Sequence, residues 1–358
     1  MAGRVLCWLA AAVALSSCRD GLGYDYATWP ACPANGLRYV KRGKADNKIT
    51  WLNLEHCNLS SLSPNELIYP GLERLDLEHN NIEFIENGSF DSLISLESVY
   101  LNSNSFLGKS LPSSLFRNCR RLLRIEFSNN DMSDTPADLL QGLYSLDFLD
   151  CDNCSLREMP IFITGAKLPI KRLSLNHNQL TRLENPATFV NFSNLDSLIL
   201  ESNKIEYLDV DLLKPLTKIR YISLMSNKIR RIPEQLFQNK SKLRIINLAK
   251  NIIDYIPDNV FLGNLLSTLD LSNNRLFYIS ENFFSVLRKG IWGQPQFYFD
   301  GNPLPCACLN ELLVKLKQLN IYYRITSYDG KNKNCIMLDN FKCLGPDTYQ
   351  EFFRKLIS

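Results

Sequence analysis

Hydrophobic residues along most of this chain follow a spacing that fits neither a regular helix nor a regular strand. In the segment LERLDLEHNNIEFI, the apolar residues Leu72, Leu75, Leu77, Ile82 and Ile85 lie three, two, five and three positions apart. A helix would give a period of 3.6 and a strand a period of 2. The pattern predicts a short strand, on which Leu75 and Leu77 point to the same side, followed by a turn.

The same pattern recurs with a period near 24 residues. Clear copies begin at Ile170, Leu195, Ile219 and Leu243, and looser copies at Ile49, Leu96, Leu122, Leu146, Leu266 and Gln294. One residue holds a fixed place after each strand, and we call it the pivot. The pivots are Cys57, Asn80, Asn104, Asn130, Cys154, Asn178, Asn203, Asn227, Asn251, Asn274 and Asn302. They define eleven units.

A unit of this kind cannot bury its own apolar face, so successive units must stack and share a core. The amide of a pivot Asn can bond to backbone groups that the turn would leave unpaired. The chain of 358 residues exceeds the usual size of a single core, but a solenoid grows in one dimension and escapes that limit. The sequence therefore predicts a right-handed solenoid with eleven parallel strands in one concave sheet.

The units closely resemble the leucine-rich repeat, L-x-x-L-x-L-x-x-N-x-L, in its 24-residue form. That form carries a Phe about eighteen residues into each unit, where Phe90, Phe237, Phe261 and Phe284 lie here, with Phe189 one place late. The resemblance covers residues 49 to about 305. It implies an α/β solenoid, a leucine-rich repeat horseshoe with a parallel concave β-sheet, an N-terminal hairpin cap and a C-terminal disulfide-bonded helical cap.

The N-terminal segment MAGRVLCWLAAAVALSSC has an early Arg, a short apolar run and small residues after it. This pattern is typical of a secretory signal peptide, which we place at residues 1–18, with cleavage after Ser16, Cys18 or Gly23. The letters LSSC also fit a bacterial lipobox, which would leave Cys18 lipidated. The run is too short to span a membrane, so we expect a secreted, extracellular protein with no membrane span.

Residues 19–48 are expected to form the N-terminal cap, ahead of the repeats at 49–304. The segment LRYVKRGKADNKITWLNL predicts a hairpin with its turn near Gly43–Ala45. If the turn centres there, Cys32 falls opposite Cys57, and we predict a Cys32–Cys57 disulfide. Cys119, Cys151 and Cys154 occupy inward or pivot positions and are expected to be buried free thiols.

Residues 305–358 are expected to form the C-terminal cap. The segment NPLPCACLNELLVKL, followed by Cys335 and Cys343, resembles the cysteine-rich cap that closes extracellular repeat arrays of animals. By that resemblance, Cys306 pairs with Cys335 and Cys308 with Cys343. The segment NELLVKLKQL places four leucines on one helical face that should cover the last turn. These are Leu312, Leu313, Leu316 and Leu319.

Five N-x-S sequons occur, which an exported chain could carry as glycosylation sites. Asn87, Asn191 and Asn239 fall in outer loops and are the favoured sites. Asn58 and Asn153 flank pivots, where the core is close, and are less favoured.

The sequence contains no phosphate loop, zinc-helix motif or nucleophile elbow. Its three histidines, His56, His79 and His177, share one place in the unit, just before the pivot. His56 and His79 could form a metal or pH-sensing site with Glu55 and Glu78, or the position could simply favour polar residues. We favour the second interpretation, because a zinc site needs a third well-placed ligand. We therefore expect no enzyme, cofactor or metal.

Function is expected on the outward strand positions, which carry no core residues. Aromatic and Arg side chains on a rigid concave sheet are typical anchors of protein interfaces. The candidate ligand-binding residues are Arg74, Tyr100, Arg124, Phe148, Arg172, Ile199, Tyr221, Met225 and Ile245. The expected partner is an extracellular or cell-surface protein, and not nucleic acid.

Charge is distributed unevenly along the repeats. Residues 49–101 hold nine acids and one base, whereas residues 214–250 hold ten bases and one acid. A basic flank on an exported protein could bind a glycosaminoglycan, or it could be a solvated surface. The basic flank comprises Arg220, Lys228, Arg230, Arg231, Lys240, Lys242 and Arg244.

Two hypotheses of function follow. In the first, this is a secreted, non-enzymatic recognition protein that binds a protein ligand through its concave face. The family resemblance extends that to innate immunity, adhesion or growth-factor control, with secreted arthropod immune repeat proteins as one candidate. In the second, it is an extracellular matrix component that binds sulphated glycan through the flank of residues 214–250. Small matrix proteoglycans of this fold carry an N-terminal cysteine cluster, whereas this chain has Cys32 there. The second hypothesis is therefore the less favoured one.

Overall fold

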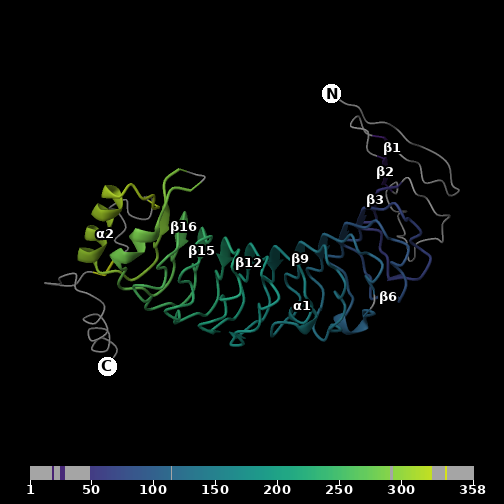
Figure 1. The fold of residues 1–358 in the computed structure, drawn as a ribbon, viewed down its shortest axis with the longest axis horizontal. Coiled ribbons are helices and arrows are strands. Elements are labelled where there is room, and N and C mark those ends of the chain that lie inside the picture. The colour runs from purple at the N-terminus through teal and green to yellow at the C-terminus, as the bar shows by residue number, and fades with distance from the viewer. Residues whose placement is uncertain are drawn as a thin grey trace.

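The computed structural model describes residues 18–19, 25–28, 49–113, 115–290, 293–324 and 335–336. Within these residues the chain winds into one arc-shaped solenoid (Figure 1). The strands of the main sheet line one long side of the arc. The short helix α1 (Ile161–Thr164) and the strand β6 (Phe84–Ile85) lie on the opposite, convex side.

The main sheet has thirteen strands in the order β1-β2-β3-β5-β7-β8-β9-β10-β12-β14-β15-β16-β17. The eleven strands from β3 onward pair in parallel, and each belongs to one of the eleven predicted units. They are β3 (Trp51–Asn53), β5 (Arg74–Asp76), β7 (Ser98–Tyr100), β8 (Arg124–Glu126), β9 (Phe148–Asp150), β10 (Arg172–Ser174), β12 (Ser197–Ile199), β14 (Tyr221–Ser223), β15 (Ile245–Asn247), β16 (Thr268–Asp270) and β17 (Gln296–Tyr298). The predicted fold is confirmed.

The register of the sheet keeps each outward position beside its counterpart on the next turn. Trp51 pairs with Arg74, and Phe148 pairs with Arg172. The inward residue between the two outward ones is buried in every unit, as Leu75 and Leu173 show. A slip of one residue would turn these leucines to solvent, so the hydrophobic pattern fixes both the core and the outward face.

The pivot asparagines form a buried row along the solenoid. In Asn80, the amide nitrogen donates to the carbonyls of Leu54 and Leu77, at 2.9 and 3.0 Å, and the amide oxygen accepts from the Leu59 N–H at 3.0 Å. Asn227 makes the equivalent bonds two-thirds of the way along the array. Each pivot Asn thus bonds to backbone groups of two successive turns, which joins neighbouring units.

The residue just before each pivot has a left-handed backbone. The values of φ run from 53° to 60° at the non-glycine members of this column, which include His56, His79, Asn153 and His177. Asn, Asp and His are several-fold enriched in this conformation. This explains why the three histidines share one place in the unit.

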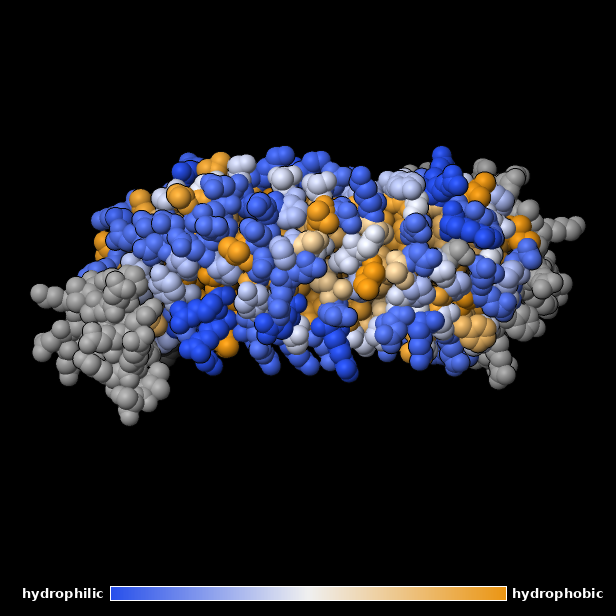
Figure 2. Space-filling model, turned by 60° about the horizontal axis from the view of Figure 1, so that its bottom comes forward, coloured by the Kyte–Doolittle hydropathy of each residue, from blue (hydrophilic) through white to orange (hydrophobic). Residues whose placement is uncertain are grey.

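The remaining elements shape the flanks and the convex side. Two short parallel pairs form there, β4 (Ser61–Leu62) with β6 and β11 (Arg182–Leu183) with β13 (Tyr207–Leu208). Short 3-10 helices occupy Gly108–Ser110 and Glu281–Val286. Figure 2 looks toward the convex side, where hydrophilic residues predominate around scattered hydrophobic ones.

At the N-terminal end, β1 (Cys18–Arg19) pairs antiparallel with β2 (Asp25–Thr28), and β2 continues the sheet parallel to β3. A hairpin is therefore present, but its position differs from the prediction. Both edges of β3 are taken by parallel strands, β2 and β5, so β3 itself cannot be the second strand of the predicted hairpin. The predicted turn at Gly43–Ala45, Cys32 and most of the signal peptide lie outside the described residues. Cys57 is disulfide-bonded, and its pairing with Cys32 stays a prediction.

At the C-terminal end, helix α2 (Cys306–Gln318) covers the last turn. Leu309, Leu312 and Leu316 belong to the core. Leu319, predicted on the same face, is instead 46% exposed, because the helix ends at Gln318 and the chain turns away.

The disulfide Cys306–Cys335 ties the start of this helix to the chain after it, as the family resemblance implied. Cys308 is also disulfide-bonded, whereas Cys343 lies outside the described residues.

Cys119, Cys151 and Cys154 are buried free thiols, as expected from their positions in the unit. Burial raises the pKa of the Cys119 thiol to about 12, so the reactive thiolate form is scarce there. Among the helices that the structure describes, none combines the length and apolarity that a membrane crossing requires.

Candidate functional site

The candidate site is the concave face, and its outward columns lie as the repeat predicted. Arg74 and Arg172 are exposed, and Tyr100, Arg124 and Phe148 are half-buried. Tyr221, Met225 and Ile245 are half-buried as well. Ile199 is only 9% exposed, because the second outward position lies deeper in the concavity, and it therefore offers little contact area.

Six side chains on the N-terminal half of this face stack into one continuous row, which we call the arginine–aromatic ladder. The members are Trp51, Arg74, Tyr100, Arg124, Phe148 and Arg172.

Each guanidinium in this ladder lies over one or two aromatic rings. The Arg74 guanidinium carbon is 5.0 Å from the centroid of the Trp51 ring and 4.5 Å from that of Tyr100. Arg124 lies 5.8 Å from the Tyr100 ring and 3.8 Å from the Phe148 ring, and Arg172 lies 5.5 Å from Phe148. Such contacts are attractive through the quadrupole of the ring.

The predicted anchors in the ladder are not independent of one another. Five residues chosen singly from the sequence, Arg74 through Arg172, touch one another and limit each other's rotamers. A side chain that is already ordered loses less conformational entropy when a partner binds. The ladder is therefore a preorganised surface rather than a set of independent anchors.

Carboxylates run beside the ladder along the other outward columns, and we call this set the acidic lane. It comprises Glu55, Asp76, Glu78, Glu126, Asp150, Asp152 and Glu201.

Polar side chains link the acidic lane across the turns. Asn102 donates to Glu78 and, at 2.7 Å, to Glu126. The Ser128 hydroxyl donates to Asp150 at 2.6 Å. The lane is a connected network rather than a row of separate charges.

The crowding of these acids changes their proton affinity. The pKa of Asp150 is raised to about 6, chiefly by burial and also by the negative charges of Asp152 and Glu126, while hydrogen bonds from Ser128 and the Asp152 N–H oppose the shift. Burial, with smaller contributions from neighbouring carboxylates, also raises the pKa values of Asp76 and Glu78. A cation brought against the lane would relieve this repulsion.

The C-terminal half of the concave face differs in character. Across β12, β14 and β15 it presents Tyr221, Met225 and Ile245 around the buried Ser223 and Ala249. The Ser223 hydroxyl donates to Glu201 at the boundary between the halves. Burial raises the pKa of Tyr221, so its hydroxyl stays protonated at neutral pH.

Several cations of the basic flank are paired with carboxylates from neighbouring turns. Arg220 pairs with Asp196 at 3.3 Å and Lys228 with Glu206 at 3.7 Å. Arg230 and Arg231 share Asp254, at 2.8 and 3.3 Å. These acids lie outside residues 214–250 and were missed by the charge count, because neighbours in a solenoid are about 24 residues apart.

Two further members of the basic flank are engaged by backbone. The Lys240 ammonium donates to the Leu213 carbonyl at 2.8 Å, and burial lowers its pKa. Arg244 donates to the carbonyls of Ser241 and Leu243. The flank therefore offers fewer available cations to a polyanion than its composition indicates.

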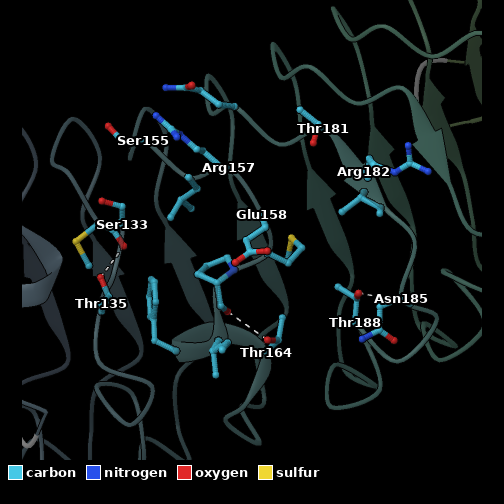
Figure 3. Close-up of a pocket in the computed structure, with 18 of the residues that line it drawn as sticks. Ser133, Thr135, Ser155, Arg157, Glu158, Thr164, Thr181, Arg182, Asn185 and Thr188 are labelled. Carbon is cyan, nitrogen blue, oxygen red and sulfur yellow. Dashed lines mark hydrogen bonds between the residues drawn. The ribbon is translucent and has the colours of Figure 1, made fainter.

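A groove of about 1250 Å³ lies between three successive turns near α1 (Figure 3). Several of its polar groups are already used by the turns themselves: the hydroxyls of Thr135, Thr164 and Thr188 each donate to a backbone carbonyl three or four residues earlier. The labelled side chains Arg157 and Glu158 come from the middle turn. Because these hydroxyls are already bonded within the turns, we favour the concave face.

The sequons differ from expectation in their exposure. Asn58 and Asn153, which were less favoured, are exposed, as are Asn87 and Asn239. Asn191 is half-buried, and its amide donates to the Thr164 carbonyl at 3.1 Å. Exposure therefore gives no reason to place Asn58 and Asn153 below Asn191.

Known proteins resemble this chain in its repeats. A family model described as leucine rich repeat matches residues 47–106, 169–229 and 217–276. Lumican from Oryctolagus cuniculus is 31% identical over 166 residues, which cover 46% of this chain and 83% of that protein. Keratocan from Coturnix japonica is 30% identical over 190 residues, which cover 49% of this chain and 52% of that protein.

The chain spans about half the length of other curated relatives, such as 47% of lumican from Rattus norvegicus. Among solved structures, a chain of the octameric complex of latrophilin 3, Unc5D and FLRT2 superposes with a TM-score of 0.54 at 20% identity. That match covers 88% of this chain and 91% of the other, and at this identity it supports the fold alone. The resemblance to arthropod secreted proteins and to the animal cysteine-rich cap stays a prediction.

Proposed function

We propose, since this chain belongs to the leucine-rich repeat family, that it is a non-enzymatic extracellular protein that holds a protein partner in its concave face. Lumican and keratocan are secreted proteins of the extracellular matrix, which supports an extracellular location. The proposal covers recognition in innate immunity, adhesion or growth-factor control, and the identity of the partner decides among these.

The observation that carries the proposal is the arginine–aromatic ladder. Its residues lie at outward positions, where the solenoid needs no particular side chain for its core. Arg and aromatic residues are the types most enriched among the residues that dominate binding energy at interfaces. Here they are stacked and partly exposed, and they run from β3, which pairs with the N-terminal strand β2, to β10 near the middle of the sheet, away from α2.

The acidic lane defines the chemistry of the partner. It places seven carboxylates beside the ladder, and the cations that contact them come chiefly from the ladder itself, as when Arg124 pairs with Glu126 at 2.5 Å. We therefore expect the partner to present basic side chains to the lane and an aromatic or apolar group to the C-terminal half. Opposite potentials of this kind raise the association rate and set the orientation.

The test begins with capture of partners from extracellular fluid on the immobilised mature protein, identified by mass spectrometry. Arg172→Ala should then weaken binding of the captured partner by roughly thirtyfold, the effect of losing an interface anchor worth about 2 kcal/mol. Arg172 contacts one ring, at the end of the ladder, so its removal should leave the fold intact.

Arg157→Ala is the matched control, because Arg157 is exposed and lines the groove near α1 instead. Normal binding by Arg172→Ala together with loss of binding by Arg157→Ala would show that the concave face is not the site.

The second hypothesis, a matrix component bound to sulphated glycan, keeps support from the similarity to lumican and keratocan. The ion pairs of Arg220, Lys228, Arg230 and Arg231 weigh against it. We therefore place it second.

A further inference from the structure

Two of the three histidines lie side by side at the N-terminal rim of the concave face. His56 and His79 occupy the same left-handed position on adjacent turns, with φ of 57° and 53°. Their rings are stacked, with centroids 4.8 Å apart and planes 13° from parallel. His177 has the same backbone conformation, but Asn153 and Ser202 hold this position on the turns beside it. The pair is therefore a feature of this end of the sheet.

A carboxylate lies beside the two imidazoles. Glu55 Oε1 lies 3.4 Å from His56 Nε2, and ligand atoms from Glu55, His56 and His79 all lie within 4.8 Å of one another. Glu78, the equivalent of Glu55 on the next turn, is held toward the following turn instead, because its carboxylate accepts a hydrogen bond from Asn102. The cluster therefore has three members.

We propose that Glu55, His56 and His79 bind a divalent transition-metal ion such as Zn²⁺. Two imidazoles and one carboxylate are a ligand set that zinc takes in proteins, with a fourth position left for water or another molecule. Imidazole nitrogens select this class of metal over Ca²⁺ and Mg²⁺, which take oxygen ligands.

The setting favours a cation as well. The side chains of His56 and Glu55 are 70% and 35% exposed, so the rings can turn from stacking to chelation without disturbing the core. Asp76 and Glu78 add negative charge beside the cluster. The proposal reverses the preference stated from the sequence, because the structure supplies the third ligand that was lacking there.

The test compares two equivalent substitutions in the full chain after treatment with a chelator. His79→Asn removes one ligand and keeps a residue suited to the left-handed backbone, while His177→Asn makes the same change where no second histidine is near. Titration calorimetry with Zn²⁺ should show one ion bound per chain in the wild type and in His177→Asn. Affinity in His79→Asn should fall on the order of tenfold or more, since even indirect partners of a zinc ligand contribute that much.

Imidazole NMR signals give an independent readout, because the chain contains only three histidines. Zn²⁺ should shift the signals of His56 and His79 and leave His177 unchanged. Equal Zn²⁺ affinity in His79→Asn and His177→Asn, or equal shifts at all three histidines, would overturn the proposal. The result does not depend on the partner in the concavity, so it can fail while the proposed function stands.

Discussion

The two halves of the concave face share one backbone and differ in almost every outward side chain. From β3 to β10 the face carries the arginine–aromatic ladder beside the acidic lane. From β12 to β15 it carries Tyr221, Met225 and Ile245, with Glu201 as the last carboxylate of the lane. The parallel pairing and the pivot bonds continue across the boundary without interruption.

The comparison shows that the repeat separates folding from recognition. Inward leucines and pivot asparagines are repeated because each turn must join the next. Outward positions are free to vary, so the stretch from β3 to β10 could become charged and the stretch from β12 to β15 largely apolar without any change of fold. Acids return at the C-terminal end, where Asp270 and Asp300 pair with Arg324. A partner that spans both halves must therefore combine cationic and apolar surface, which is a more selective requirement than either alone.

The largest effect should come from the framework, and it should be equal in the two halves. Asn80→Ala and Asn227→Ala each remove one buried amide with equivalent bonds to two turns. Each should lower the free energy of unfolding by about 3 kcal/mol, because buried backbone groups lose their partners. Chemical denaturation of both variants measures this. A cost confined to one half would mean that the halves differ in their framework as well as their surface.

A smaller loss of stability should separate two arginines of the ladder. Arg124 lies between two rings and pairs with Glu126, which is 9% exposed. Arg124→Ala should cost about 1 to 2 kcal/mol, from two cation–π contacts and a poorly compensated carboxylate. Arg172→Ala, with one ring contact at 5.5 Å, should stay within about 0.5 kcal/mol. Melting temperatures equal to that of the wild type for both variants would show that these arginines of the ladder contribute nothing to folding.

The raised pKa of Asp150, about 6 in the folded protein against an ordinary 3.8 for the group, gives a pH-dependent prediction. An acid whose pKa is raised by folding stabilises the folded state below pH 3.8, and that contribution is lost as pH rises to about 6. Asp150→Asn imitates Asn247, which holds the same column in the C-terminal half. The variant should be more stable than the wild type at pH 7, on the order of 1 kcal/mol after allowance for partial exposure.

Urea denaturation of Asp150→Asn and wild type at pH 7 and near pH 3.5 measures this difference. It should shrink toward zero at the lower pH, where Asp150 is protonated in the folded state and mostly protonated in the unfolded state. A difference that stays constant with pH would assign the effect to packing or hydrogen bonding rather than to the charge.

The sequence predicted the fold, the register and the outward columns because all three follow from one repeated apolar pattern. It did not predict the ladder, although its residues had been chosen one by one. The stacking zigzags from the first outward position of Arg74 to the second outward position of Tyr100 and back to Arg124. Only the coordinates show that these side chains meet. Aligning the units in rows, one under another, would have given the nearest available signal.

The wrong predictions have one origin. They considered neighbours along the sequence, whereas the contacts in a solenoid run between successive turns. A charge count over residues 214–250 omitted Asp196, Glu206 and Asp254, each about one turn from its partner. Leu319 was placed on a helical face because the period continued, but the helix ends one residue earlier. The hairpin near Gly43 was paired with a strand whose two edges the solenoid already uses.

The smallest expected effect concerns the basic flank and decides whether a second site exists outside both halves. Asp254 holds Arg230 through Oδ2 at 2.8 Å and Arg231 through Oδ1 at 3.3 Å. Asp254→Asn should release both guanidinium groups. If the flank binds sulphated glycan, this variant should elute from heparin at higher salt than the wild type, since such attraction is screened by ions.

Asp138→Asn makes the same change in net charge at an exposed acid far along the chain, and any shift it shares reflects net charge alone. Identical elution of the two variants would leave the flank as a solvated surface, because releasing two arginines would have added nothing that a distant charge does not. A shift specific to Asp254→Asn would instead show that the ion pairs restrain a glycan site. Released Arg230 and Arg231 would then bind the glycan, which would support the matrix hypothesis.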